Sequence, residues 1–214
     1  MIFFALPEEA RPFRKLAAAA AAAAGRSQVV VTGMGTRNAE RVARATLTGA
    51  ARPELVLTCG YAGGLNPALP PLTLLFSADA PESVAAALQK FGARAGRFHC
   101  APRVAITAAE KRALFAESGA DAVEMESGVI RKICGELGIP CVTLRVISDA
   151  ANEDLPLDFN RLTTPEQNLD FAKLAWAVAT APGKIPALLA LGKRTAAAAR
   201  KLGQALDQLV RELR

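Results

Sequence analysis

The sequence predicts an α/β fold of three layers, α/β/α, with a largely parallel, mixed central sheet and a helical extension at residues 182–214. Two observations support this prediction. Short apolar and β-branched runs alternate with longer segments of helical periodicity, as in sheets whose strands are joined by crossover helices. Glycine-rich turns follow several of the short runs, where a strand would pass into a helix. Because no repeat or linker divides the chain, we expect residues 1–214 to form a single domain.

The short apolar runs give the expected strands. Most of them are rich in valine, isoleucine, leucine or phenylalanine, and a turn residue or a change of periodicity ends each run. Residues 92–102 are poorly patterned, and the polar stretch at residues 152–168 is expected to be an irregular, lid-like loop. The expected strands lie at residues 2–6, 28–32, 54–58, 72–77, 104–107, 120–124 and 141–147.

The helices are predicted from their ends and faces. Pro7, Glu8 and Glu9 open the first helix, because proline suits the first turn and acidic residues favour the positive end of the helix dipole. An alanine tract then extends this helix, since alanine has the highest helix propensity. Gly138 and Pro140 stop a later helix whose apolar residues share one face. The expected helices span residues 7–25, 37–51, 81–91, 108–117, 126–137, 169–181 and 186–213.

Composition narrows the function classes only partly. The chain carries 26 Lys and Arg against 20 Asp and Glu, a net charge of +6. This excess suits an anionic substrate, a nucleic acid or a membrane surface without choosing among them. The four cysteines form no C-x-x-C pair and are expected to be buried, reduced thiols. The N-terminus lacks a basic leader region and no apolar run is long enough to span a bilayer, so a cytoplasmic protein is expected.

Carboxylates stand beside apolar elements in two places, and they are the main candidates for chemistry. Ser148 and Asp149 follow the apolar run at residues 141–147, and partial burial there would raise the pKa of Asp149 and make it a general acid. The simpler alternative is an Asp that caps the next segment. Glu124 and Glu126 stand at a helix start, where acids are common. An ionised carboxylate there could also accept both hydroxyls of a vicinal diol, and spacing does not say which glutamate would do so.

Two glycine turns and a single histidine complete the candidates. The segment from Gly60 to Gly64 frees backbone N–H groups to face a ligand. The turn at Gly33 and Gly35 lacks the remaining residues of a dinucleotide or P-loop motif, so a tight turn between strand and helix is the simpler interpretation. His99 has no Cys, Asp or Glu at ligand spacing, and we expect neither a metal nor a cofactor.

The C-terminal helix is basic, with leucines between its Lys and Arg residues. In the simpler interpretation, the helix docks on the domain and its basic face is solvated. In the more specific alternative, the basic face contacts an anionic membrane surface. Nucleic-acid binding is not expected, because the helix has no interleaved aromatic residues.

Three motifs together resemble a known family. Gly-Tyr-Ala-Gly-Gly-Leu at 60–65, Val-Glu-Met-Glu-Ser at 123–127 and Arg-Val-Ile-Ser-Asp-Ala at 145–150 are similar to motifs of the nucleoside phosphorylase superfamily. Within it they look like methylthioadenosine/S-adenosylhomocysteine nucleosidases and, above all, hopanoid-associated phosphorylases. The resemblance covers about residues 1–180, and the long C-terminal helical segment is similar to that of the hopanoid-associated members.

The resemblance implies cleavage of the N-ribosidic bond of a purine nucleoside, with release of adenine. Asp149 would protonate the purine at N7, and Glu9 would position the attacking water. Glu126 would hold the ribose 2′- and 3′-hydroxyls, and Met125 would pack against the sugar. The transition state would resemble that of glycoside hydrolysis. Base and acceptor binding would involve Gly60, Tyr61, Ala62, Gly63, Ser148, Val104, Gly35 and Arg37.

The resemblance also implies a homo-oligomer, with a dimer favoured, and a substrate that carries a lipid on the ribose 5′ carbon if the chain is of the hopanoid-associated kind. Phosphate is a possible co-substrate. Tyr61 stands where relatives carry a small Ser or Thr, and Thr58 and Cys59 occupy the stretch where phosphorylases place an arginine, which leaves Arg37 as a candidate cation. The alternative hypothesis is therefore an inactive nucleoside-binding module.

Overall fold

The structure is a computed structural model that describes residues 1–19, 27–49, 52–164 and 170–213. One mixed sheet forms its centre, in the strand order β2-β1-β3-β8-β4-β5, and β7 joins β3 to β6. Most neighbouring strands are parallel, and the β3–β7 and β4–β8 pairs are antiparallel. The strands are β1 (Ile2–Phe4), β2 (Val29–Val31), β3 (Val56–Gly64), β4 (Leu74–Ser77), β5 (Arg94–Gly96), β6 (Phe98–Cys100), β7 (Ala122–Glu124) and β8 (Cys141–Asp149).

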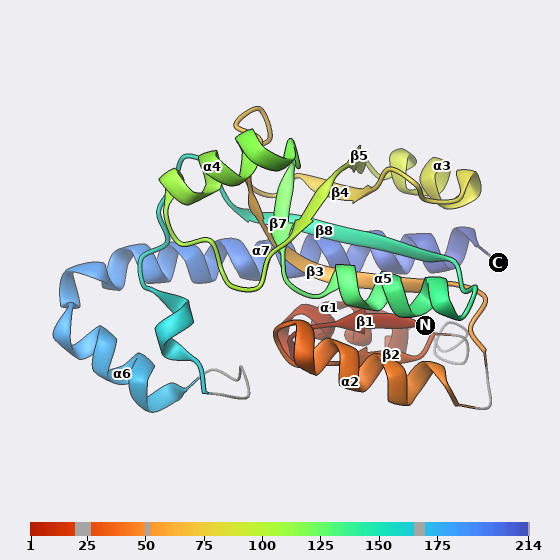
Figure 1. Cartoon of the computed structure of the whole chain (residues 1–214), viewed down its shortest axis with the longest axis horizontal. Coiled ribbons are helices and arrows are strands. Elements are labelled where there is room, and N and C mark those ends of the chain that lie inside the picture. Colours follow the sequence, from red (N-terminus) through yellow and green to blue (C-terminus); the bar gives the residue numbers. More distant parts are fainter. Residues whose placement is uncertain (20–26, 50–51, 165–169, 214) are drawn as a thin grey trace.

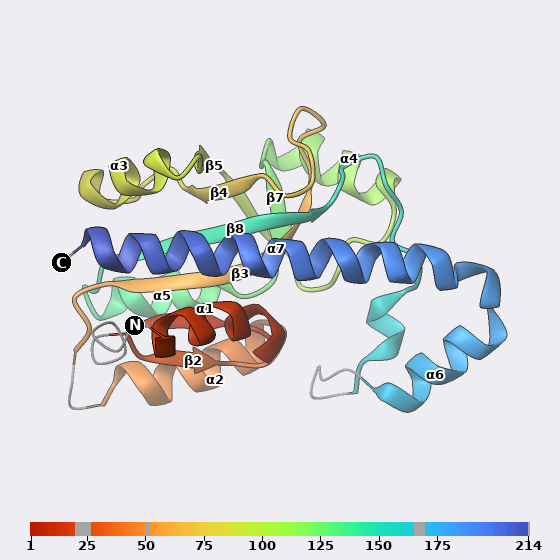
Figure 2. The ribbon, with the colours of Figure 1, turned by 180° about the vertical axis from the view of Figure 1, so that it is seen from behind.

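Helices cover both faces of this sheet, as predicted (Figures 1 and 2). Side chains alternate between the two faces along each strand: Ile2 and Phe4 pack toward α1, α3 and α7, whereas Phe3 packs toward α2 and α5. The α-helices are α1 (Pro7–Ala19), α2 (Thr36–Leu47), α3 (Glu82–Lys90), α4 (Ala108–Ser118), α5 (Ser127–Glu136), α6 (Phe171–Thr180) and α7 (Ile185–Glu212). The expected helix ends at residues 20–25, 50–51 and 169 lie outside the described residues.

Helix α7 has two different halves. Its second half packs along the sheet and buries Leu202, Leu206 and Leu209, so the interpretation of a docked helix with a solvated basic face is confirmed there. Its first turns extend beyond the sheet and join α6 through the short turn η2 (Pro182–Lys184), so that α6 lies away from the body (Figure 2). We call α6, η2 and the first turns of α7 the arm, residues 171–190.

Two expectations about local structure were wrong, and one stretch without a clear pattern contains two strands. Residues 104–107 form no strand, because the backbone of Val104 bonds to the side chain of Asn160 instead of a neighbouring strand. The poorly patterned residues 92–102 contain β5 and β6, each of only 3 residues and too short for a recognisable pattern. The expected loop from Gly60 to Gly64 lies inside β3, since β8 and β7 supply its hydrogen-bond partners. The loop at residues 152–164 includes a short 3₁₀ helix, η1 (Phe159–Leu162).

The cysteines largely follow the prediction. All four are free; Cys59 and Cys134 are buried and Cys141 is intermediate, but Cys100 is exposed, which corrects the expectation for that residue.

Candidate active site

Buried acidic groups gather toward the carboxyl ends of β1, β3 and β8, beside the first turns of α2 and α5. Ligands of parallel sheets bind at this end of the strands. The starts of α2 and α5 are tied together here: Gly35 donates to Glu126, and the Thr36 hydroxyl donates to the carbonyl of Met125 at 3.0 Å. Four of the residues predicted from the sequence are buried at this end of the strands: Glu9, Glu126, Ser148 and Asp149.

Glu9, at the start of α1, turns its carboxylate back toward the sheet. One oxygen accepts the N–H groups of Ala5 and Leu6 at 3.1 and 2.9 Å, and the other accepts the N–H of Tyr61 at 2.8 Å. Burial raises the pKa of Glu9 to about 7, although Arg145 and these N–H donors oppose the rise. A carboxyl group that titrates near neutrality can act as a general base.

Arg145 is the buried cation of this cluster, and sequence reasoning quoted it in a motif without giving it a role. It is paired with Gly60 across the parallel β3–β8 register. Because Gly60 has no side chain, the guanidinium can lie over it; a Cβ at residue 60 would clash with Arg145 Nη1 and would come within 2.6 Å of Glu9 Oε1. Gly60 therefore serves the site through the space it leaves for a cation rather than through a free N–H group.

The two glutamates of the second motif have different surroundings. Glu124 accepts from Arg145 Nη2 at 2.6 Å, from the N–H groups of Glu126 and Ser127, and from the Ser127 hydroxyl. Burial alone would raise the pKa of Glu124, but Arg145 and these donors lower it overall. Glu124 is thus more than the helix-start charge that the sequence suggested, because it also anchors Arg145.

Glu126 retains more freedom to bind a ligand. Its Oε1 accepts the N–H of Gly35 at 2.8 Å, and Arg145 Nη2 lies 3.5 Å from its Oε2. Gly35 adopts φ 81°, a left-handed conformation that favours glycine, and this turn aims its N–H at the carboxylate. Burial raises the pKa of Glu126, partly offset by Arg145. The geometry therefore favours Glu126 over Glu124 as an acceptor for a ligand's hydroxyls.

Asp149 ends β8 and is held at both of its oxygens. The Ser148 hydroxyl donates to Oδ1 at 2.6 Å, and Lys111 Nζ donates to Oδ2 at 2.5 Å. Gly63 is the β3 residue paired with Asp149, and a Cβ there would lie 3.4 Å from Oδ2. The alternative of a helix-capping Asp is not what the structure shows, because both recorded partners of this carboxylate are side chains.

Lys111 is the residue that sequence reasoning missed most completely. It is fully buried, and it is the only residue of α4 that is buried. Polar and apolar residues are mixed along α4 with almost no helical periodicity, so nothing in the sequence distinguished Lys111 from its neighbours.

The remaining predicted residues lie around this cluster. Met125 is half-buried, and Arg37 is exposed at the start of α2. Ala62 is buried, and its carbonyl oxygen lies 3.3 Å from the Ser148 hydroxyl. Val104 is half-buried, with its N–H and C=O both bonded to the side-chain amide of Asn160, at 2.9 and 3.0 Å.

Tyr61 faces away from the acidic cluster. Its ring packs against the apolar core between the sheet and the helices α1 and α7, on the sheet face opposite Gly60. Burial, with Glu9 and Glu8, raises the pKa of its hydroxyl. Only its backbone N–H contributes to the cluster, through Glu9. The large side chain therefore does not fill the acidic site, which weakens the hypothesis of an inactive module.

No group of three or more His, Cys, Asp or Glu side chains in the described ranges could hold a metal ion. Within those same ranges, no single helix is long and apolar enough to cross a membrane; only the bent pair Phe171–Thr180 and Pro182–Glu212, taken together, has the length and composition of a span.

Comparison with known proteins agrees with this geometry. A model of the family described as the phosphorylase superfamily matches residues 81–180. The predicted resemblance to that superfamily is confirmed. The matched stretch includes Glu124, Glu126, Lys111, Arg145 and Asp149.

Sequence relatives of this superfamily match over short stretches. A 5′-methylthioadenosine/S-adenosylhomocysteine nucleosidase of Mycobacterium tuberculosis is 47% identical over 45 residues, which is 21% of this chain and 18% of the relative. The same enzyme of Shewanella halifaxensis is 46% identical over 39 residues, or 18% of this chain and 17% of the relative. The matches thus span less than a fifth of the curated relatives' length.

Solved structures share the fold over the whole chain. The futalosine hydrolase of Helicobacter pylori aligns with a TM-score of 0.69 at 18% identity, covering 99% of this chain and 96% of that one. A Colwellia psychrerythraea 5′-methylthioadenosine/S-adenosylhomocysteine nucleosidase in complex with adenine aligns with a TM-score of 0.69 at 17% identity, covering 99% and 94%. The fold of this phosphorylase-like chain is therefore that of these hydrolases, as expected.

Proposed function

We propose that this protein cleaves the N-ribosidic bond of an adenine nucleoside and releases the free base. The observation that carries this proposal is a group of three buried carboxylates toward the carboxyl ends of the strands. Glu126 and Asp149 form the main pair, and Glu9 is the third. Carboxylates in such different surroundings can divide the work of binding a diol and moving protons. The similarity to nucleosidases that act on methylthioadenosine supports the same conclusion.

In the proposed reaction each group has one task. Glu126 accepts hydrogen bonds from the ribose hydroxyls, with Met125 against the sugar. Asp149 gives a proton to N7 of the purine, so that the electrons of the C1′–N9 bond pass into a better leaving group. Ser148 fixes the direction of that carboxyl group through its 2.6 Å hydrogen bond. Glu9 takes a proton from the nucleophile that attacks C1′, the carbon that carries developing positive charge.

The charges of the site favour water over phosphate as that nucleophile. A phosphate dianion needs a cation with free donors. Arg145 Nε has no hydrogen-bond partner, but Glu124 and Glu126 already offset the charge of its guanidinium, and each N–H of the Lys111 ammonium has a protein acceptor. The pKa of Glu9, about 7, suits activation of water. Measuring adenine release with and without phosphate tests this point: we expect equal rates, and a strict phosphate requirement would contradict it.

The nucleoside activity itself is tested by incubating the protein with adenosine and with methylthioadenosine and quantifying free adenine by chromatography. We expect release from at least one of them. Calorimetry that shows nucleoside binding without any release would instead favour a binding module.

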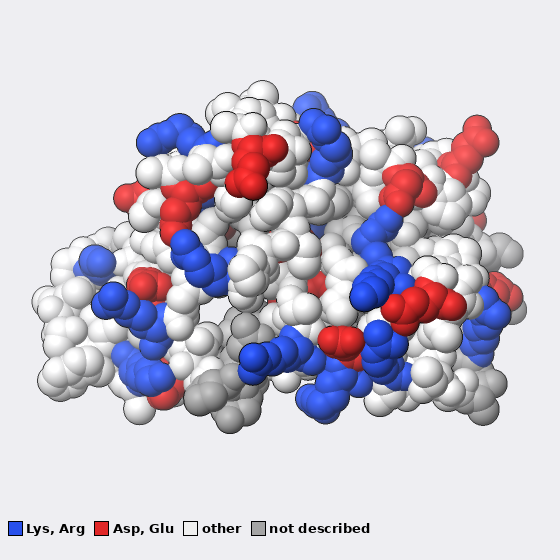
Figure 3. Space-filling model, in the orientation of Figure 1, with Lys and Arg blue, Asp and Glu red and all other residues white. Residues whose placement is uncertain are grey.

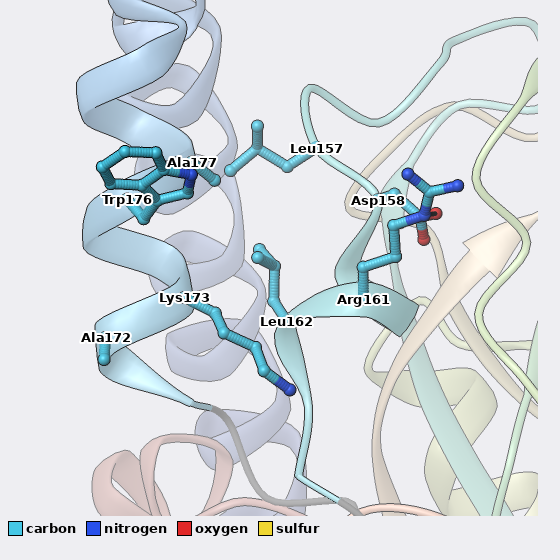
Figure 4. Close-up of a pocket in the computed structure, with 8 residues that line it drawn as sticks. All are labelled: Leu157, Asp158, Arg161, Leu162, Ala172, Lys173, Trp176 and Ala177. Carbon is cyan, nitrogen blue, oxygen red and sulfur yellow. Dashed lines mark ion pairs between the residues drawn. The ribbon is translucent and has the colours of Figure 1, made fainter.

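We also propose an apolar 5′ substituent on the substrate, such as the hopanoid chain that the resemblance suggests. What supports this is a cavity of about 470 Å³ between η1 and α6, into which Leu157 and Leu162 point while Asp158 and Arg161 face away (Figure 4). Asn160 of η1 connects this region to Val104. A 5′-alkylated adenosine should have a lower KM than adenosine, and Leu162→Asp should remove that advantage while KM for adenosine stays unchanged.

The arm is proposed to contact an anionic membrane surface. None of the 10 residues of α6 is buried, and Phe171, Trp176 and Leu189 are 76%, 72% and 62% exposed. On the face shown in Figure 3, the outer end of the arm is largely uncharged, and Lys and Arg side chains lie beside it. Exposed Lys184 and Lys193 are suited to acidic headgroups.

Sedimentation with phosphatidylcholine vesicles, with and without phosphatidylserine, tests this contact. The wild-type protein should pellet only with the acidic vesicles, and Trp176→Ser should stay in solution. Equal binding with and without phosphatidylserine, and equal binding by the variant, would contradict the contact. The homodimer expected from the resemblance stays a prediction, which sedimentation velocity checks.

A further inference from the structure

To act as an acid, Asp149 must obtain a proton before the purine leaves. A carboxyl group that pairs with a cation is held in its ionised form, and an ionised carboxylate cannot act as an acid. Lys111 Nζ lies 2.5 Å from Asp149 Oδ2, and both side chains are buried. Lys111 thus favours the ionised form of Asp149, and its ammonium is also the nearest group that could give Asp149 a proton.

Lys111 is placed with all of its donors satisfied. Besides Asp149, its ammonium donates to the carbonyl oxygens of Ala150 and Glu153, both at 2.8 Å. These carbonyls belong to the turn that directly follows Asp149. Arg194 of α7 forms an ion pair with the Glu153 side chain and so ties the turn to the long helix. The three acceptors match the three donors of a lysine ammonium, which fixes Nζ against Oδ2.

We propose that Lys111 is a positioning residue that supplies the proton of Asp149, an inference that rests on the proposed nucleoside cleavage. The ion pair and the neutral pair of amine and carboxylic acid differ only in which atom of the Nζ–Oδ2 hydrogen bond holds the proton. Burial disfavours the two separate charges. A nucleoside that covers the site and excludes water therefore shifts the pair toward the neutral form.

The proton count of the reaction then balances. The Nζ–H bond of Lys111 breaks as the Oδ2–H bond of Asp149 forms, and the carboxyl proton passes to N7 as the C1′–N9 bond breaks. Lys111 is left as a neutral amine beside the ionised Asp149. The attacking water gives one proton to Glu9 and adds its hydroxyl to C1′. After the base leaves, Glu9 releases that proton to solvent and Lys111 regains one, so the net reaction is hydrolysis alone.

Two substrates separate proton supply from a structural role. Adenine is a poor leaving group that needs protonation, whereas the nitrophenolate of 4-nitrophenyl riboside leaves without it. Lys111→Met should lower kcat for adenosine or methylthioadenosine by about 100-fold or more, the range of general acid catalysis, and should lower kcat for the nitrophenyl riboside by less than about 5-fold. Arg112→Met, which removes the adjacent exposed cation of α4, is the matched control and should leave both rates unchanged.

Two further variants make the test decisive. Lys111→Gln keeps N–H donors but has no proton to transfer at neutral pH, so it should show the same selective loss; recovery of the wild-type rate would overturn proton supply. Asp149→Asn should show the same selectivity, and adding Lys111→Met to it should cause no further loss on adenosine. Circular dichroism and thermal melting confirm that each variant folds.

An equal loss on both substrates would make Lys111 structural, and no loss on either would give it no role, so each overturns the inference while nucleoside cleavage stands. A wild-type protein that cleaves neither riboside overturns the proposed function, and the inference with it.

Discussion

The site contains two buried cations whose surroundings differ in charge. Arg145 is bonded to Glu124, lies 3.5 Å from Glu126 and interacts electrostatically with Glu9, so negative charge exceeds positive charge there. Lys111 faces one carboxylate and two neutral carbonyls, so that centre is balanced. In the first centre the pKa values of Glu9 and Glu126 are raised by burial, and these two carboxylates can accept protons and hydrogen bonds. The second holds a single proton next to the predicted acid. A buried cation beside carboxylates thus serves proton acceptance at Arg145 and proton donation at Lys111.

The largest effect is expected at the balanced centre. Asp149→Asn removes the acid but keeps the size of the side chain, so kcat for adenine release should fall by about 100- to 10,000-fold with an unchanged fold. Chromatographic measurement of adenine checks this. Asp154→Asn, which changes an exposed carboxylate a few residues further along the chain, is the control and should retain the wild-type rate. An active Asp149→Asn protein would eliminate Asp149 as the acid.

Removing the cation of the acidic centre should mainly cost stability. Arg145→Met leaves Glu9, Glu124 and Glu126 buried without their counter-ion, and breaking such a cluster typically lowers the free energy of unfolding by about 3–5 kcal/mol. Urea titration measures the loss, and Arg112→Met should change stability by less than about 0.5 kcal/mol. The deficit should shrink at acidic pH, where the stranded carboxylates become protonated. A deficit that does not depend on pH would contradict the charge explanation.

Glu9 should make stability depend on pH in a defined window. Its pKa is about 7 in the folded protein against 4.5 for the unfolded group, so the folded state binds more protons between these values. Stability from this group is therefore present below pH 4.5 and is lost as pH rises through 7, by about 3 kcal/mol in total. The free energy of unfolding of the wild type, minus that of Glu9→Gln, should fall across this window. Glu8→Gln, at an exposed neighbouring position, should show no such trend.

A smaller effect is expected for the diol acceptor. Glu126→Gln removes the charge that binds the ribose hydroxyls, and a hydrogen bond to a charged group contributes about 1.5–3 kcal/mol. KM for adenosine should rise about 10- to 100-fold, with a smaller rise for 2′-deoxyadenosine, which lacks one of the hydroxyls. Steady-state kinetics on both nucleosides checks this, with the exposed Glu117→Gln as control. Equal rises for both nucleosides would argue against a diol contact.

The sequence predicted the parts of the fold that local patterns encode. Long apolar strands such as β8 and helices such as α4 were placed correctly, and Asp149, for which partial burial was considered, is buried. Strands of three residues, such as β5 and β6, have no pattern long enough to detect. The expected strand at residues 104–107 failed because a side chain, that of Asn160, bonds the backbone that a neighbouring strand would otherwise pair with.

The candidate site shows the same limit. Asp149 and the pair Glu124 and Glu126 were identifiable because they stand beside apolar elements, and only the family resemblance favoured Glu126 over Glu124. Their partners were not identifiable: nothing in the pattern of α4 indicates that Lys111 faces inward, and for Arg145, inside the predicted strand β8, only the tertiary arrangement shows which carboxylates surround it. Gly60 was assigned to a ligand-binding loop, and only the register between β3 and β8 shows that it makes room for Arg145.

The most direct test of N-ribosidic cleavage at Asp149 is a time course of free adenine released from methylthioadenosine and adenosine by the wild-type protein and by Asp149→Asn, without phosphate. Enzymatic release by the wild type, with at least a 100-fold lower rate in the variant, is the predicted result. No release by the wild type, or equal release by both proteins, would contradict it.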